Sequence, residues 1–349
     1  MRVMTYNVKT GGYDGPRATR LDAIAEVVAA QAPDVLALQE LRGASGEWLA
    51  DRLGMRMVRA RSAWGQPVAV LVGPEWTVLD AGSVARPFHH AAARVAVSTL
   101  GGPLTVVSAH LHPHWGWRRL HEARWLVSAV RGARLALVMG DLNTLDPWTD
   151  HTERLRRLPP PYRLRHLRWR PLHRPAPDDA VPPSAGPGRG GSVGGGPEAA
   201  GLAGGGSDGR GSGAAGLAGG GSGGRGSGAA GLAGGGSGGR GSGAAGAGDG
   251  GRWVSGGGSR EVGRVARVDT RAVAALDAAG LVDVFRAAGA GRVETAPTAL
   301  GGPEFSGMRL DYLFASPALA AYVRSCRVVE SPDADRASDH YPVVADIDL

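Results

Sequence analysis

Apolar residues along the first half of the chain alternate between short strand-like runs and stretches with helical spacing. Strands are predicted at 2–8, 35–40, 55–61, 67–73, 76–83, 93–100, 104–110 and 134–140. Helices are predicted at 17–31, 46–53 and 117–131, the first because Leu21, Ile24, Ala25 and Val28 recur at helical spacing. A Gly-Gly-Pro turn at 101–103 joins two of the strands into a hairpin. The pattern is typical of an α/β fold.

A glycine-rich tract interrupts this pattern. Residues 186–258 hold 37 of the 58 glycines, and residues 200–244 repeat a 15-residue unit three times. Each unit carries one leucine and no apolar face, so it cannot offset the entropy of ordering, and we expect disorder. Beyond the tract, a helix at 270–279 and strands at 309–315 and 341–348 resume the pattern. One domain formed by 1–175 and 262–349, with a disordered insert at 176–261, is therefore predicted.

The charge is concentrated in the first part of the chain. The whole chain carries +7, while residues 1–175 carry 24 basic against 14 acidic residues, a net of +10. Such a surface favours an anionic partner: nucleic acid, a phospholipid head group or a sugar phosphate. A single cysteine, Cys326, and the lack of a secretory signal or a membrane-spanning run lead us to expect a cytoplasmic protein, monomeric and with its thiol reduced.

Polar side chains stand where the predicted strands begin or end. Asn7, Glu40 and His110 each follow an apolar run, and so do Asp141 and Asn143. The same placement occurs in the second part of the chain, with Asp311, Asp339 and His340. Strand ends hold side chains rigidly enough for chemistry. Carboxylates, amides and imidazoles in these places are the inventory of a metal-assisted hydrolase.

These residues lie in motifs that resemble the ordered signature of the endonuclease/exonuclease/phosphatase superfamily, the deoxyribonuclease I-like metal-dependent phosphoesterases. The motifs are TYNV at 5–8, LQE at 38–40, SAHL at 108–111, GDLN at 140–143, RLDYLFAS at 309–316 and SDHYPV at 338–343. The resemblance covers about 260 residues and omits the insert. It implies a four-layer α/β/β/α sandwich of two packed mixed sheets with outer helices.

The resemblance also implies roles for the metal-binding residues. Glu40 is expected to bind Mg²⁺, or Mn²⁺ in its place, and an acid at the end of a buried strand needs such a compensating charge. Asn7 and Asp339 are expected to help position the metal or its waters. The implied reaction is hydrolysis of a phosphate ester by in-line attack of water, in a nuclease or other phosphodiesterase. The alternative is a phosphatase or phospholipase C-like hydrolase acting on a lipid or sugar phosphate.

The remaining polar residues are expected to act on the phosphate and on the water. The resemblance implies that Asp141 orients or deprotonates the attacking water and that Asn143 binds the phosphate. It pairs Asp311 with His340, so that the carboxylate favours the imidazolium that stabilises the transition state. His110 is expected to supply a further donor. Locally, an Asx turn competes as an explanation of Asp141 and Asn143.

Three further features keep alternatives open. His112 and His114 permit a zinc hypothesis, which Pro113 and the lack of a cysteine ligand weaken. Arg118 and Arg119, beside Trp115 and Trp117, are candidate substrate-binding residues. The arginine-rich stretch at 154–174 has two interpretations, a nucleic-acid-binding surface or a solvated loop. For the whole protein, a binding module that keeps the fold without catalysis is a further alternative.

Overall fold

The computed structural model describes residues 1–15, 19–171 and 264–349. The chain divides into two units, one formed by Met1–Arg174 with Val262–Leu349 and the other by Pro175–Glu261. All described residues belong to the first unit. The glycine-rich insert and its repeats lie outside the described residues, so the disorder expected there and the domain limits stay predictions.

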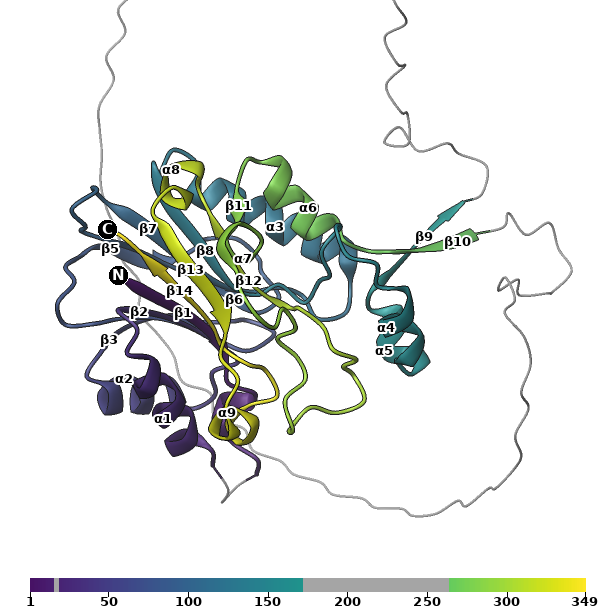
Figure 1. The fold of residues 1–349 in the computed structure, drawn as a ribbon, viewed down its shortest axis with the longest axis horizontal. Helices are drawn as coiled ribbons and strands as arrows, with labels where there is room; N and C mark the ends of the chain where they lie inside the picture. Colours follow the sequence, from purple (N-terminus) through teal and green to yellow (C-terminus); the bar gives the residue numbers. More distant parts are fainter. Residues whose placement is uncertain (16–18, 172–263) are drawn as a thin grey trace, which may run out of the picture. The chain divides into compact units, whose positions relative to one another are not determined.

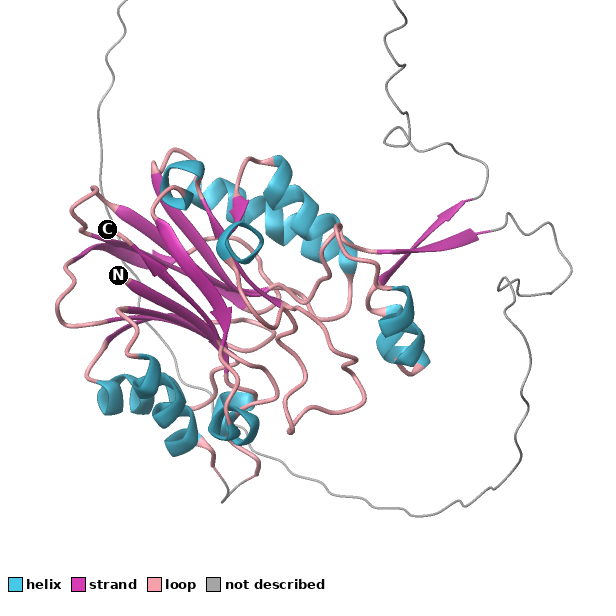
Figure 2. Ribbon diagram, in the orientation of Figure 1, coloured by secondary structure: helices cyan, strands magenta, loops and turns pink. Residues whose placement is uncertain are grey.

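Two six-stranded sheets form the centre of the described unit (Figures 1 and 2). The first sheet has the order β13 (Val323–Val328), β14 (Val343–Ile347), β1 (Arg2–Asn7), β2 (Val35–Gln39), β4 (Val68–Val72), β3 (Arg56–Ala60). The second has the order β11 (Val282–Asp283), β12 (Asp311–Ala315), β8 (Leu135–Asp141), β7 (Leu104–His110), β6 (Ala91–Val97), β5 (Val78–Ser83). Strands β9 (Leu167–Pro171) and β10 (Arg264–Val268) form a separate antiparallel pair. Both large sheets are mixed, since β1 and β2 are parallel and so are β7 and β8.

Helices cover the outer face of each sheet (Figure 1). The first sheet packs against α1 (Leu21–Gln31), α2 (Ser45–Leu53) and α9 (Pro332–Ala337), and the second against α3 (Gly116–Val130) and α6 (Arg271–Ala278). The short elements are η1 (Thr10–Gly12), α4 (Thr152–Arg157), α5 (Pro160–Leu164), α7 (Val284–Ala288) and α8 (Pro317–Ala320). The predicted four-layer α/β/β/α sandwich is confirmed. None of the helices among the described residues has the length and apolar character needed to span a membrane.

The apolar strands serve two cores at once. Along β1, Val3 faces the core between the sheets, while Met4 and Tyr6 face the core beneath the helices. Along β2, Val35 alternates in the same way with Leu36. Successive side chains of a strand point to opposite faces, so a strand buried on both sides must be apolar throughout. This explains why the sequence shows continuous apolar runs in place of apolar–polar alternation.

The predicted elements agree closely with those observed, with differences at their ends and in the second half. The hairpin around 101–103 is present as β6 and β7. The first helix begins at Leu21, four residues later than predicted, because Arg20 is not helical. Short elements of the second half, such as α7, α8 and β13, were not predicted. Helices α7 and α8 have too few residues to show a helical period, so contacts elsewhere in the fold determine them.

Strand direction brings the polar strand ends together. The register pairs Asn7 with Gln39 on β2, which places Glu40 beside the end of β1. It pairs His110 with Asp141, and Asp141 with Asp311. Strand β14 runs antiparallel to β1, so Asp339 and His340, just before β14, lie near the end of β1. Both sheets therefore present their polar residues at one shared edge.

Gly140 is required where β8 approaches this edge. Its φ of +143° is unfavourable for other residues, and a Cβ there would lie 1.9 Å from the carbonyl oxygen of Ala109 on β7. We expect Gly140→Ala to lower the free energy of unfolding by about 2–5 kcal/mol, because backbone strain and a main-chain clash add together. Urea denaturation followed by circular dichroism measures this loss.

Gly102→Ala is the matched control for this prediction. Gly102 also has a positive φ, +103°, but an added Cβ would meet open space. Its substitution should cost only the backbone strain, about 1–3 kcal/mol. Equal losses in the two variants would contradict the close approach between Gly140 and β7.

Candidate phosphoesterase active site

A pocket of about 220 Å³ opens at the shared edge of the two sheets. Its walls include six of the residues predicted from the sequence: Glu40, His110, Asp141, Asn143, Asp339 and His340. Asn7 and Asp311 lie directly behind the wall, each hydrogen-bonded to a residue that lines it. These side chains come from both sheets, so the pocket exists only when the sandwich is complete.

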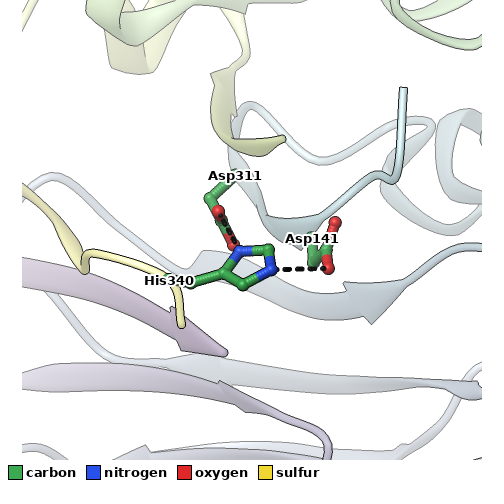
Figure 3. Close-up of side chains that lie close together, drawn as sticks. All are labelled: Asp141, Asp311 and His340. Carbon is green, nitrogen blue, oxygen red and sulfur yellow. Dashed lines mark hydrogen bonds and ion pairs between the residues drawn. The ribbon is translucent and has the colours of Figure 1, made fainter. Parts of the chain in front are cut away.

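His340 lies between two carboxylates (Figure 3). Its Nδ1 is 2.7 Å from Oδ2 of Asp311, and its Nε2 is 3.9 Å from Oδ2 of Asp141. Burial alone would lower the pKa of the imidazole, but Asp311, Asp141 and Asp339 together raise the pKa well above its ordinary value. His340 is therefore cationic, and its Nε2–H is directed toward the Asp141 side of the pocket.

Asp141 is the buried carboxylate at the centre of the pocket. Its Oδ2 accepts a hydrogen bond from Nδ2 of Asn7 at 3.0 Å, and Nε2 of His110 lies 3.4 Å from the same oxygen. Burial raises the pKa of Asp141 to about 7, with Asp311 and Glu40 contributing repulsion and His340 opposing them. A carboxyl group with this pKa can exchange a proton near neutral pH.

His110 is a neutral donor in this arrangement. Burial, with the charge of His340, lowers the pKa of His110 to about 3. The expected donor role is thus compatible with the structure only as an uncharged imidazole. The positive charge on this side of the pocket belongs to His340.

Asn143 combines two functions that the sequence presented as competing. Its main-chain N–H donates to Oδ1 of Asp141 at 2.8 Å, which is the hydrogen bond of an Asx turn. Its side chain lines the pocket, held by a hydrogen bond from Nδ2 to the carbonyl oxygen of Leu111 at 3.0 Å. Its φ of +50° is one that asparagine adopts more readily than most residues. The turn is the local means by which Asn143 reaches the pocket.

Glu40 and Asp339 provide further acidic oxygens in the pocket wall. Glu40 accepts hydrogen bonds from Nδ2 of Asn7 at 3.1 Å and from the main-chain N–H of Thr10 at 2.9 Å. Nζ of Lys9 lies 3.4 Å from Oδ2 of Asp339. Burial raises the pKa of Asp339, and the negative charge of Glu40 adds to this increase. Two carboxylates that repel each other across a pocket fit a hard divalent cation.

The donor set decides which cation fits. Among the described residues, one group of three His, Cys, Asp or Glu residues has its ligand atoms within 4.8 Å of one another: Asp141, Asp311 and His340. In this group the imidazole of His340 is already hydrogen-bonded to Asp311, whereas Mg²⁺ prefers oxygen ligands. Glu40 and Asp339 therefore suit Mg²⁺ or Mn²⁺ better. His112 and His114 belong to no such group, and Nδ1 of His112 accepts two main-chain N–H groups, so the structure gives the zinc hypothesis no support.

Two residues outside the set predicted from the sequence support Glu40 and His110. Nε2 of Gln66 donates to Oε2 of Glu40 at 3.1 Å, and the main-chain N–H of Gln66 donates to Nδ1 of His90 at 2.9 Å. The ring of His90 stacks on His110 with centroids 3.8 Å apart and an interplanar angle of 1°. Both residues precede predicted strands, Gln66 before β4 and His90 before β6. Because β4 is antiparallel to β2, the residues just before β4 lie beside Glu40, and strand direction would have supplied this signal.

The two arginines predicted to bind substrate differ in their placement. Arg119 is fully buried, and its guanidinium donates to the carbonyl oxygens of His112 and Arg165 at 3.2 and 2.6 Å. This disagrees with substrate contact, and Arg119 instead holds two loops beside the pocket. Arg118 is half-buried, with its guanidinium carbon 5.6 Å from the ring centroid of Trp117, and it does not line the pocket.

His166, in the pocket wall, should make stability depend on pH. Burial, with the charges of Arg119 and Arg165, lowers the pKa of its imidazole to about 3, against about 6.5 in an unfolded chain. The unfolded chain thus binds the proton more tightly. The contribution of neutral His166 to the free energy of unfolding is complete above pH 6.5 and falls by about 2 kcal/mol as the pH falls to 5. Urea denaturation at a series of pH values measures this.

His166→Asn should lose about 2 kcal/mol less stability than the wild type as the pH falls to 5, because the imidazole of His166 no longer takes up a proton on unfolding. His121→Asn is the control, since the His121 side chain is exposed on α3. If His166→Asn loses stability with pH as steeply as the control, the assignment to His166 is wrong.

A family model described as Endonuclease/Exonuclease/phosphatase family matches residues 4–340. No curated protein matches the chain. Solved structures share the fold at low identity. An endonuclease/exonuclease/phosphatase from Bacteroides vulgatus has 13% identity and a TM-score of 0.56, over 100% of this chain and 98% of that one.

Two further structures show the same fold. The endonuclease/exonuclease/phosphatase from Beutenbergia cavernae is 17% identical with a TM-score of 0.54, covering 100% of this chain and 71% of its own. The structure of D. rerio TDP2 complexed with a single strand DNA product is 13% identical with a TM-score of 0.53, covering 99% and 97%. The family match includes every strand-end residue gathered at the pocket. The chain belongs to the endonuclease/exonuclease/phosphatase family.

Proposed function

We propose that the chain is a divalent-metal-dependent phosphodiesterase that hydrolyses nucleic acid by in-line attack of water. The observation that carries this proposal is the pair formed by Asp311 and His340 at 2.7 Å, which faces the buried carboxylate of Asp141 within one pocket. A fixed cation opposite a carboxylate of raised pKa suits a reaction in which a water loses a proton while a phosphoryl group gains charge.

Glu40 and Asp339 would hold the cation, because both offer oxygen donors and each carboxylate repels the other. Mg²⁺ or Mn²⁺ bound there would neutralise charge on the phosphoryl oxygens and on the leaving oxygen. Glu40 is held in place for this task by Asn7, Thr10 and Gln66. Asn7 also donates to Asp141, so a single amide sets the spacing between the metal side and the water side of the pocket.

The protein's own groups divide the remaining work. Asp141 aligns the attacking water and accepts its proton. The cationic His340 donates from Nε2 to a phosphoryl oxygen, and Asp311 fixes its ring and its charge. Asn143 and the neutral His110 offer additional hydrogen bonds without adding charge. Since these donors are preorganised before the substrate arrives, they stabilise developing charge without reorganisation.

Charge suits nucleic acid as a substrate, and the comparison with a DNA-bound structure favours it. Residues 1–175, which supply most of the pocket, carry a net charge of +10. Arg165 lies in the pocket wall, where it can meet a phosphate. The D. rerio TDP2 structure of the same fold holds a single strand DNA product. The charge suits any phosphate, and the DNA-bound structure supports a phosphodiester of nucleic acid over the lipid or sugar phosphate that the sequence also permitted.

The experiment is a substrate comparison at fixed metal concentration. Purified full-length protein is incubated with Mg²⁺, Mn²⁺ or EDTA and offered plasmid DNA, single-stranded oligonucleotides, and a panel of phosphorylated lipids and sugars. We expect metal-dependent cleavage of the nucleic acids. Hydrolysis confined to a phosphomonoester or a phospholipid would replace the proposal with the phosphatase or phospholipase C-like alternative.

A further inference from the structure

Two exposed tryptophans lie at the start of α3, close in sequence to Pro113, which lines the catalytic pocket. Trp115 and Trp117 are 56% and 52% exposed, with ring centroids 6.1 Å apart and an interplanar angle of 13°. Large aromatic side chains on a surface usually mark a binding site when they occur together. We call these two residues the tryptophan platform.

The platform is connected to the catalytic pocket by a series of ring contacts. Trp115 stacks on His112 with centroids 4.9 Å apart and an angle of 16°. His112 meets His89 at 4.4 Å, and His89 meets His90 at 4.7 Å, edge to face. His90 then stacks on the catalytic His110. The rings thus lead from the pocket to the protein surface without interruption.

The orientation of Trp115 is fixed by its support. His112 is buried, and its Nδ1 accepts hydrogen bonds from the main-chain N–H groups of His114 and Trp115 at 3.0 and 3.1 Å. The ring beneath Trp115 is therefore held by the same backbone that carries the tryptophan. A planar ligand can stack on such a surface with little further loss of side-chain entropy.

The surroundings of the platform are positively charged. The guanidinium of Arg118 lies over Trp117, and Arg165 lies close enough to His114 to lower the pKa of that imidazole, after the effect of burial. Arg165 also lines the catalytic pocket. The nearby acid Glu122 is buried, and its two oxygens accept the main-chain N–H groups of His89 and His112 at 2.8 and 2.7 Å. The platform thus offers planar faces and positive charge along one path.

We propose that the tryptophan platform binds unpaired bases of a single-stranded nucleic acid whose scissile phosphate lies in the catalytic pocket. This deepens, and rests on, the proposed function. Exposed aromatic rings with neighbouring arginines bind single strands, because each base offers a face to stack and each phosphate a charge to neutralise. The bases of an intact duplex are already stacked on one another, so their faces cannot reach the platform. The substrate class is therefore single-stranded nucleic acid or an unpaired end.

A membrane surface is the competing partner for exposed tryptophans beside arginines. Insertion into lipid does not require rings to be aligned with one another or supported from beneath. The parallel stacking of Trp117, Trp115 and His112 is a feature that only a planar ligand uses. The structure accordingly favours bases, and vesicles enter the experiment as its alternative outcome.

The test measures binding by the full chain in EDTA, where hydrolysis cannot occur. Fluorescence anisotropy of a labelled 12-nucleotide single strand is compared with that of the matching duplex and with sedimentation of anionic phospholipid vesicles. We expect the single strand to bind most tightly, and Trp115→Ala with Trp117→Ala to weaken it about 10- to 100-fold. Leu100→Ala is the control, because Leu100 is fully exposed before the start of β7, at the end of the strand away from His110. This variant should bind the single strand as the wild type does.

A conservative variant guards against loss of fold. Trp115→Phe with Trp117→Phe keeps the ring faces, so it should retain binding within about threefold while losing the quenching of tryptophan fluorescence that the single strand causes. Unchanged affinity in the alanine variant, or equally tight binding of duplex, overturns the proposal. Binding of vesicles with no binding of the single strand overturns it in favour of a membrane.

The proposed function can fail separately from the platform. Wild-type protein is assayed with Mg²⁺ on bis(p-nitrophenyl) phosphate, a small diester that carries no bases. Platform-dependent binding without any diester hydrolysis would leave the platform standing and refute the phosphodiesterase. Hydrolysis of the diester without platform-dependent binding would support the phosphodiesterase and refute the platform.

Discussion

Asp141→Asn is expected to lower kcat for phosphodiester hydrolysis by about 10²- to 10⁴-fold, the range that a positioned general base contributes. The amide keeps the shape of the carboxylate and the acceptor that the main-chain N–H of Asn143 uses. It cannot take a proton from water. Initial rates over a range of substrate concentrations separate this loss in kcat from a change in KM.

Stability distinguishes a catalytic role of Asp141 from a structural one. The carboxylate is buried, which disfavours its charge, so its removal should leave the melting temperature within a few degrees of the wild type. Asp346→Asn is the matched control, because Asp346 forms a surface ion pair with Arg2 and has no part in the pocket. Retained turnover in Asp141→Asn, with the control also active, would refute the assigned role.

The central part of this site could be predicted because strands fix it. Asn7, His110 and Asp141 are the last residues of their strands, and Asp311 is the first of its strand. A side chain in such a place is positioned by the sheet, whose apolar run is visible in the sequence. The order of the motifs along the chain, as in the resembled family, then indicated which strand ends lie together. The α/β class followed from the same runs and the helical periods between them, and the family resemblance implied the four layers.

Residues that do not stand at the end of a predicted apolar strand were not predictable in the same way. Arg119 looked like a surface arginine, but α3 turns it inward, where it donates to the carbonyl oxygens of two loops. Gln66 and His90 act through partners that are distant in sequence, and only the pairing of β4 with β2 and of β6 with β7 brings them to the pocket. Such roles depend on tertiary contacts that no periodicity encodes.

Glu40→Gln is expected to raise the Mg²⁺ concentration for half-maximal activity by at least about 100-fold, because even residues that merely support a metal ligand cost 10- to 100-fold. The amide keeps one of the two acceptor oxygens, which can accept from either Asn7 or Thr10, and removes the negative charge that holds the cation. A second readout does not depend on turnover. Saturating Mg²⁺ should raise the melting temperature of the wild type and have little effect on Glu40→Gln.

Two further variants make this prediction decisive about where the cation lies. Glu47→Gln makes the same chemical change on the surface of α2, where Glu47 pairs with Arg59, and should behave as the wild type. Asp311→Asn should lose most of its activity, because His340 loses the partner that holds its ring and charge, yet keep its stabilisation by Mg²⁺. If Asp311→Asn instead abolishes that stabilisation while Glu40→Gln retains it, the cation lies among Asp141, Asp311 and His340. The proposed division of the pocket into a metal side and a dyad side would then be wrong.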